Sequence, residues 1–268
     1  MENSLGFKEI SPFMFRIASI ENIGENVIVN DQHTHDVCEI YMNLSGDVSF
    51  MVENTVYPIE RGSIIITRPF EAHHCIYHSK KEHDHIWILF SAKGNEELFD
   101  LFFAREKGVD NLIVLSPEKV EEFITVCKRL VEEKLSEFQK YNLFFTLLNL
   151  LHEGTQKNTV DTKIKKEILS ALNIINKNIS EVISISELSK MLNLSVRTFE
   201  RQFKTEIGMT PMEYVKKRRL TLSKAYLAED YTVSEASEMC GFSDCSSFIQ
   251  SFKKEYGLTP YKFKSGLE

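Results

Sequence analysis

Residues 203–211 read F-K-T-E-I-G-M-T-P, and residues 252–260 read F-K-K-E-Y-G-L-T-P. The two stretches share Phe, Lys, Glu, Gly, Thr and Pro at a constant offset of 49 residues. An internal repeat of this kind indicates one supersecondary unit that is built twice. Because each stretch ends in signals that stop one helix and start another, the last quarter of the chain is predicted to be helical.

Capping residues predict the helices of the first copy. Residues 184–187 have the pattern of a capping box, in which side-chain oxygens satisfy free N–H groups at a helix start. A short helix over 186–192 is followed by a turn and by a second helix that Ser195 can cap. Gly208 is expected to end this second helix in the left-handed conformation. Thr210 and the proline after it then open a long helix that reaches about residue 227.

The second copy repeats these signals. A capping box at residues 232–235 starts a short helix that ends near Cys240. Ser243 or Asp244 can cap the next helix, which Gly257 is expected to end. The turn between the two helices reads Gly-Phe, where the first copy has Asn-Leu. Both copies therefore predict two helices joined by a tight turn.

A helix-turn-helix unit of this kind lays its second helix in the major groove of DNA. Arg pairs with guanine and Gln with adenine, whereas Lys204 and Lys253 are suited to phosphates. A solvated helix face would explain one such unit, but two copies with matched caps favour DNA binding. The apolar stripes leave these outward-facing residues as candidate contacts: Arg197, Glu200, Arg201, Lys204, Ser246, Ser247, Gln250, Ser251 and Lys253.

Residues 163–268 resemble the DNA-binding domain of the AraC/XylS transcription regulators, through S-V-R-T-F-E-R-Q-F-K at 195–204 and G-F-S-D-C-S-S-F-I-Q at 241–250. The resemblance implies seven helices, with the long one joining two units that enter successive major-groove segments of bent DNA. It also implies an activator that contacts RNA polymerase. Gln250 replaces a frequent Arg of the family, so the second DNA reader is nearly uncharged. This asymmetry predicts a non-palindromic DNA site for each subunit.

The charge of the chain is divided unequally. The whole chain carries a formal charge of -7. Residues 163–268 hold 17 Lys and Arg against 13 Asp and Glu, whereas residues 1–162 hold 15 against 26. The run at 216–219, Lys-Lys-Arg-Arg, adds a basic patch to the long helix. The positive balance of the second part supports a double-stranded DNA operator as its partner.

Composition favours a cytoplasmic protein. The five cysteines form no C-x-x-C pair and are odd in number, which fits reduced thiols better than a disulfide framework. The chain shows no charged-then-apolar leader and no long uncharged apolar run. Secretion and membrane association are therefore not expected.

Residues 1–95 have the pattern of a β-barrel or sandwich. Short alternating segments recur at 38–44, 48–52, 55–59, 63–67 and 85–90, with turn residues between them. The fold class is thus predicted to be α+β with two domains, an N-terminal β-barrel with appended helices and a C-terminal all-α double helix-turn-helix domain.

A set of His and Glu residues lies on one face of this barrel. His33, His35, Glu39, Tyr41 and Asn43 share strand parity, and His73 ends a later segment. The pattern H-x-H-x3-E-x6-G followed by G-x10-H resembles the two cupin motifs, in which His33, His35, Glu39 and His73 would converge on a metal. The second motif departs from the cupin pattern at Arg68 and at Glu71, where Pro and Gly are expected.

Such a set has three interpretations. It can bind a polyhydroxylated effector such as a sugar, with Tyr41 and Trp87 beside His33, His35, Glu39 and His73, and no cofactor is then required. It can bind a divalent metal such as Zn, Mn, Fe or Ni, alone or with an effector. It can also be a barrel that keeps these residues without a ligand. The neighbouring histidines, His74, His78, His83 and His85, are interpreted as solvated.

Residues 96–155 are predicted to form a helical packing and dimerisation segment, and residues 156–162 a polar linker. Residues 120–131 carry an apolar seam, and residues 143–151 are apolar nearly all round. Packing within one chain is the alternative to a homodimer. The sequence thus predicts a transcription regulator, not an enzyme, that is controlled by an effector. A metal-responsive regulator is the first alternative and a metal-dependent cupin enzyme the second.

Overall fold

The computed structural model of the chain describes residues 2–10, 13–20, 33–79, 82–132, 134–157, 164–181 and 183–266. The chain divides into two compact units by its internal contacts. The first unit comprises residues 1–31 and 35–162, and the second comprises residues 32–34 and 163–268. Within the described ranges, no helix combines the length and the apolar character that a membrane span requires.

The N-terminal unit is built on two antiparallel sheets. The larger has the strand order β1-β2-β8-β3-β6-β9-β10 and the smaller the order β5-β4-β7. The strands are β1 (Glu2–Ile10), β2 (Phe13–Ile20), β3 (Cys38–Asn43), β4 (Val48–Val52), β5 (Thr55–Pro58), β6 (Ser63–Thr67), β7 (His73–Tyr77), β8 (His83–Phe90), β9 (Leu112–Val114) and β10 (Thr155–Lys157).

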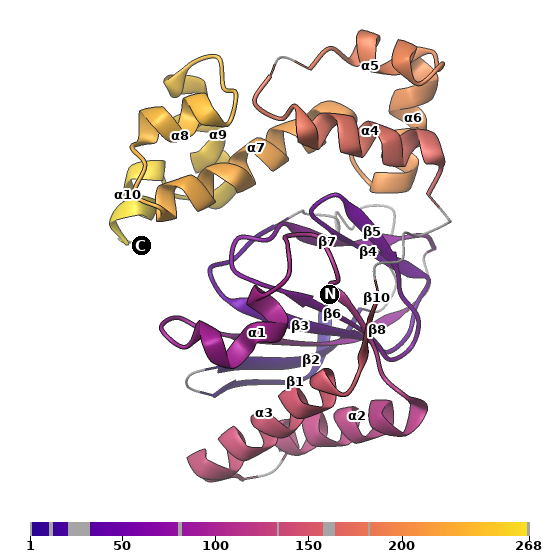
Figure 1. The fold of residues 1–268 in the computed structure, drawn as a ribbon, viewed down its shortest axis with the longest axis vertical. Helices are drawn as coiled ribbons and strands as arrows, with labels where there is room; N and C mark the ends of the chain where they lie inside the picture. The colour runs from indigo at the N-terminus through magenta and orange to yellow at the C-terminus, as the bar shows by residue number, and fades with distance from the viewer. Residues whose placement is uncertain are drawn as a thin grey trace. The chain divides into compact units, whose positions relative to one another are not determined.

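Alternation along the strands gives the larger sheet two different faces. Ile40 of β3 and Ile88 of β8 are buried in an apolar core with Phe123 of α2 (Pro117–Glu132) and Leu147 of α3 (Glu137–His152). The two helices lie together along one side of the sheet in Figure 1. Tyr41, on the opposite face of β3, packs with residues of β4 and β5 in a second cluster. The short helices η1 (Glu96–Phe99) and α1 (Asp100–Phe103) follow β8.

Residues 96–155, predicted as a helical segment that follows the barrel, also contribute strands to the larger sheet. Strand β9 lies inside this segment and pairs with β6, and β10 pairs with β9. Residues 155–157 are therefore a sheet strand, and the rest of the predicted linker, residues 158–162, lies outside the described residues. The sequence conceals both strands, because three residues are too short for a periodic pattern and β10 is wholly polar and exposed.

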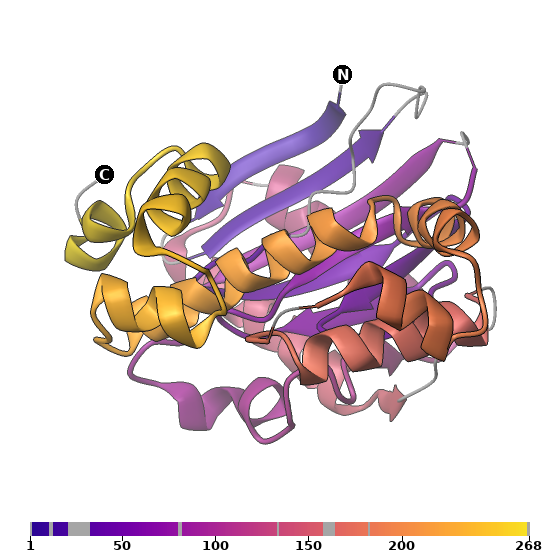
Figure 2. The ribbon, with the colours of Figure 1, turned by 90° about the horizontal axis from the view of Figure 1, so that it is seen from above.

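The C-terminal unit contains seven helices among its described residues, as the resemblance implied. They are α4 (Lys166–Lys177), α5 (Ile185–Met191), α6 (Val196–Ile207), α7 (Pro211–Ala228), α8 (Val233–Met239), α9 (Cys245–Tyr256) and α10 (Pro260–Ser265). In Figure 2 the long α7 runs from the α4–α6 group to the α8–α10 group. Gly208 and Gly257 end α6 and α9 in the left-handed conformation.

The two tight turns have the same hydrogen bond. The Leu194 N–H donates to the Ser189 carbonyl at 2.9 Å, and the Phe242 N–H donates to the Ser237 carbonyl at 3.1 Å. Asn193 and Gly241 take positive φ angles of 55° and 77° at the matching positions. Asn and Gly are the residues that adopt this conformation at least cost. The repeat in the sequence is therefore a repeat of structure.

Candidate nucleic-acid interface and ligand site

Helix α6 presents a charged outer face. Its inner face buries Phe199, Phe203 and Ile207, and Ser195 caps its start by accepting the Thr198 N–H. The side chains predicted to contact DNA all lie on the exposed face: Arg197, Glu200, Arg201 and Lys204. The amphipathic pattern of the helix thus leaves two guanidinium groups and one ammonium group available to bases and phosphates.

Helix α9 presents a nearly neutral outer face. Phe248 and Phe252 are buried, and Ser246, Ser247, Gln250 and Lys253 are exposed, whereas Ser251 is half-buried. Asp244, and not Ser243, caps this helix. Its carboxylate accepts the Ser247 N–H and the Ser247 hydroxyl, each at 2.7 Å. The Ser247 hydroxyl proton is therefore used within the protein, and its oxygen can only accept a further bond.

The basic run on α7 is not a free patch. Arg219 donates to three backbone carbonyls, and Arg218 donates through Nε to Asn176 Oδ1 at 2.8 Å. Lys217 forms an ion pair of 3.1 Å with Glu255. Lys216 is the member of the run that is exposed. The predicted patch is thus largely a set of internal contacts, because α7 lies between the two helix-turn-helix units.

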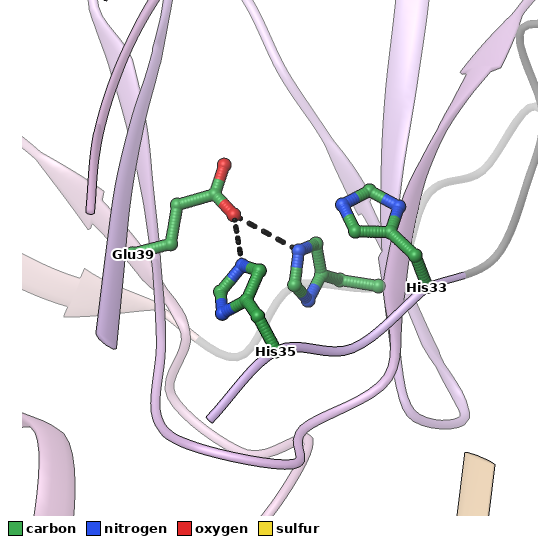
Figure 3. Close-up of side chains that lie close together, drawn as sticks. His33, His35 and Glu39 are labelled. Carbon is green, nitrogen blue, oxygen red and sulfur yellow. Dashed lines mark hydrogen bonds and ion pairs between the residues drawn. The ribbon is translucent and has the colours of Figure 1, made fainter. Parts of the chain in front are cut away.

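The predicted His and Glu set does converge. The ligand atoms of His33, His35, Glu39 and His73 all lie within 4.8 Å of one another. Figure 3 shows the His35 side chain beside the Glu39 carboxylate, with the His33 side chain farther from it along the same segment of chain. Glu39 Oε2 lies 2.8 Å from His35 Nε2 and 2.9 Å from His73 Nε2. Because His33 is only two residues from His35, local chain geometry keeps it near the cluster.

The cluster is electrostatically coupled. Burial alone would raise the pKa of Glu39, but the charge of His73 and hydrogen bonds with both imidazoles hold that pKa well below its ordinary value. Burial would lower the pKa of His73, but the Glu39 carboxylate raises it. A carboxylate in this position favours a positive partner, whether a proton on an imidazole or a metal ion.

The donor set fits a divalent transition metal. The ring Nδ1 of His35 lies 2.9 Å from the Val37 carbonyl, and that of His73 lies 2.8 Å from the Glu71 carbonyl. A carbonyl at this position fixes the proton on Nδ1 and leaves Nε2 as the ligand atom. Three imidazoles and one carboxylate suit zinc and its neighbours. His33, His35, Glu39 and His73 are therefore the residues that would hold such an ion.

The sequence interpretation of the neighbouring histidines as solvated is wrong for three of them, of which His83 and His85 share the interior face with Tyr41. His74, His83 and His85 are buried within strands β7 and β8. Tyr41 Oη lies 2.8 Å from His83 Nε2, and its ring stacks on His85 at a centroid distance of 5.4 Å. The alternation of residues 83, 85 and 87 along β8 was the signal for this arrangement.

Asn43 and Trp87 complete this face of the larger sheet. Trp87 is half-buried and pairs in register with Tyr41. Asn43 is 1% exposed and pairs with His85, and within the part of the chain that the structure describes neither atom of its amide has a hydrogen-bond partner. A buried amide without partners is costly unless a ligand or solvent satisfies it. Asn43, His83 and His85 are thus candidate ligand residues that the initial set omitted.

Glu71 explains one departure from the cupin pattern. Its carboxylate accepts two hydrogen bonds from Arg105, at 2.8 and 2.6 Å, and the Gly108 N–H at 2.7 Å. The Arg68 N–H also donates to it, at 2.9 Å. Burial would raise the Glu71 pKa, but these bonds and the Arg105 charge lower it. A buried ion pair therefore occupies the place where the pattern expects glycine.

Comparison with known proteins assigns both units. The family described as the AraC-like ligand binding domain matches residues 18–113, and the family described as the Helix-turn-helix domain matches residues 188–266. Among solved structures, the C-terminal domain of the response regulator yesN from Fusobacterium nucleatum is 30% identical, with a TM-score of 0.34. That match covers 35% of this chain and 94% of the yesN domain.

Two named relatives are transcription regulators. The probable transcriptional regulator LumQ of Photobacterium leiognathi is 38% identical over 93 residues, 34% of this chain and 38% of LumQ. The transcriptional activator RhaS of Yersinia pestis is 32% identical over 127 residues, 47% of this chain and 46% of RhaS. This chain thus matches less than half the length of each relative. With an AraC-like ligand binding domain followed by a helix-turn-helix domain, the chain belongs to the AraC/XylS family.

Proposed function

We propose that this chain is a sequence-specific DNA-binding transcription regulator controlled by a ligand of its N-terminal unit. The observation that carries the proposal is the pair of capped helices, α6 and α9, each behind a tight turn and each with an exposed polar face. The same placement of a helix behind a turn reads the major groove in helix-turn-helix proteins. Ligand binding is expected to shift the population toward one DNA-binding state.

Replacing Arg201 with Ala should weaken binding to the preferred DNA site by about 1–3 kcal/mol, because one bidentate base contact is lost. The probe is a duplex that the full chain selects from a randomised pool, with affinity measured by fluorescence anisotropy at fixed salt. The matched control is Arg129→Ala, which removes the same charge from an exposed position of α2. Equal losses for both variants, or none for Arg201→Ala, would contradict the assignment of α6.

For the ligand, we propose a small polyhydroxylated molecule of sugar type. The support is the interior face, where His35, Glu39, Tyr41, Asn43 and Trp87 offer donors, acceptors and an aromatic ring. A ligand present at 100 times its dissociation constant should stabilise the native state by about 2.7 kcal/mol. In a thermal-shift screen of sugars, His35→Ala should abolish the shift and the exposed His152→Ala should retain it. A shift that survives His35→Ala would exclude this face as the ligand site.

A metal-responsive regulator is the second candidate, favoured by the backbone carbonyls that orient His35 and His73. The same thermal-shift screen includes Zn, Mn, Fe and Ni ions. Stabilisation that a chelator reverses, together with metal-dependent affinity for the selected duplex, would support this candidate. Because the named relatives are transcription regulators, we propose no catalytic role for the cluster.

We further propose an activator of RNA polymerase that acts in the cytoplasm. The support is the name of the relative RhaS, a transcriptional activator. In-vitro transcription from a promoter that carries the selected site would test the proposal. More transcript with the chain and its ligand than without them is expected, and less transcript would indicate a repressor.

We also propose a homodimer formed through α3. Most apolar residues of α2 and α3 pack within their own unit, so the predicted seam of 120–131 is an intrachain contact. Phe138, Tyr141 and Phe145 nevertheless remain exposed as a neutral stripe on α3. An exposed aromatic stripe is typical of an interaction surface. Sedimentation equilibrium should give a dimer that Phe145→Asp dissociates and Thr125→Asp, on the exposed face of α2, does not.

A further inference from the structure

Arg219 connects parts of the C-terminal unit that lie far apart in the sequence. Its Nε donates to the Ile179 carbonyl at 2.9 Å, and its two terminal nitrogens donate to the Glu181 and Gly241 carbonyls at 2.6 Å each. Ile179 and Glu181 belong to the loop between α4 and α5, which leads into the first helix-turn-helix unit. Gly241 is the turn of the second unit. The Arg219 guanidinium, in the middle of α7, thus connects the loop before the first helix-turn-helix unit to the turn of the second.

The loop and the turn also touch directly. A Cβ atom on Gly241 would lie 2.3 Å from the carbonyl oxygen of Ser180 and 2.8 Å from its Cα. Only glycine allows so close an approach of two backbones at a positive φ of 77°. The matching position of the first copy is Asn193, so that turn does not require glycine. The second copy therefore has Gly in its turn because this turn packs against the backbone of the loop before the first helix-turn-helix unit.

Helix α4, which leads into the bridging loop, is held to α6 and to α7. Lys165, at the start of α4, forms an ion pair of 3.0 Å with Glu206 of α6. Asn176, near the end of α4, donates to Tyr214 Oη of α7 at 2.7 Å. If the turn of the second helix-turn-helix unit moved relative to the loop, that turn would therefore also move relative to α6. A single connecting helix can bend or twist, whereas a second contact away from its axis opposes rotation.

We propose that Arg219 is a positioning residue that fixes the separation of α6 and α9, and thereby the number of base pairs between the two DNA elements that the chain reads. This inference rests on the proposed DNA-binding function. Arg219 acts through the loop at 179–181 and through Gly241, and its donors point at carbonyls instead of phosphates. The expected consequence of its loss is relaxed spacing between the two elements, in addition to weaker binding.

To measure this spacing, the full chain first selects a duplex from a randomised pool. Its affinity is then measured for that duplex and for two derivatives, one with a base pair added between the elements and one with a base pair removed. The wild-type chain should bind the altered duplexes about 10-fold more weakly, because the DNA or the protein must deform. Arg219→Gln should bind all three within about 3-fold of one another. Arg219→Lys, which keeps the charge but cannot span three carbonyls, should behave as Arg219→Gln does. Lys216→Gln, an exposed loss of charge on α7, should keep the wild-type preference.

The possible outcomes distinguish a failure of the proposed DNA-binding function from a failure of the role assigned to Arg219. A pool from which the wild-type chain enriches no sequence would overturn the proposed function and this inference together. A spacing preference that Arg219→Gln or Arg219→Lys retains, in protein with wild-type helical circular dichroism, would overturn this inference alone. An equal loss of preference in Lys216→Gln would also overturn it, since charge and not geometry would then be responsible. If Arg219→Gln fails to fold, Arg219→Lys carries the test.

Discussion

Replacing Glu71 with Gln should lower the free energy of unfolding of the N-terminal unit by about 3–5 kcal/mol. The Glu71 and Arg105 side chains are 0% and 5% exposed, and two hydrogen bonds join them. The substitution removes the anion but leaves the buried guanidinium, which cannot lose its proton. An uncompensated buried charge is the reason for the size of this effect.

The fluorescence of Trp87, the single tryptophan of the chain, can report unfolding of this unit in urea. The control is Glu121→Gln, which breaks the exposed Arg61–Glu121 pair of 3.0 Å and should change the free energy by less than about 1 kcal/mol. A loss below 1 kcal/mol in Glu71→Gln would show that this ion pair is not a major support of the unit. The result bears on the ligand site, because the Glu71 carbonyl also orients His73.

Replacing Gly241 with Ala should destabilise the C-terminal unit by about 3 kcal/mol, through a left-handed alanine and a clash with the Ser180 backbone. Gly257→Ala is a matched control, because Gly257 has the same φ of 77° and, apart from its chain neighbours, no described residue has a heavy atom within 4 Å of the added Cβ. This control should cost about 1 kcal/mol from backbone conformation alone.

The helical circular dichroism transition, compared with Trp87 fluorescence, separates unfolding of the C-terminal unit from that of the N-terminal unit. The difference between the two glycine variants measures the contact between the second turn and the loop at 178–181. Equal stabilities for Gly241→Ala and Gly257→Ala would mean that the two backbones separate at little cost, and that this contact does not constrain the two helix-turn-helix units.

The helices of the C-terminal unit could be predicted because their boundaries depend on neighbours in the sequence. Thr210 and Glu213, and likewise Thr232 and Glu235, form capping boxes within one helical turn. Ser184, Ser195 and Asp244 each accept an N–H three residues later. Interactions over three residues leave a pattern that the sequence alone displays.

The convergence of His35, Glu39 and His73 was also predictable, from strand parity and from the cupin resemblance. The same strand parity also predicts that His83 and His85 are buried. The high density of histidines between residues 73 and 85 favoured a solvated segment instead. Strand β10 gave no signal, because its three residues are polar and exposed and only their pairing with β9 makes them a strand.

The sequence alone was sufficient to predict the doubled helix-turn-helix unit, its caps and turns, and the outward-facing residues of each second helix. The folded structure was needed to show that Arg219 joins the two helix-turn-helix units instead of offering its charge to DNA, and that Glu71 pairs with Arg105 where the motif expects glycine. Caps and turns are set within a few residues of chain, whereas the carbonyl partners of Arg219 and the ion-pair partner of Glu71 are 22 to 40 residues away. Such contacts exist only once the chain has folded, because no local period encodes them.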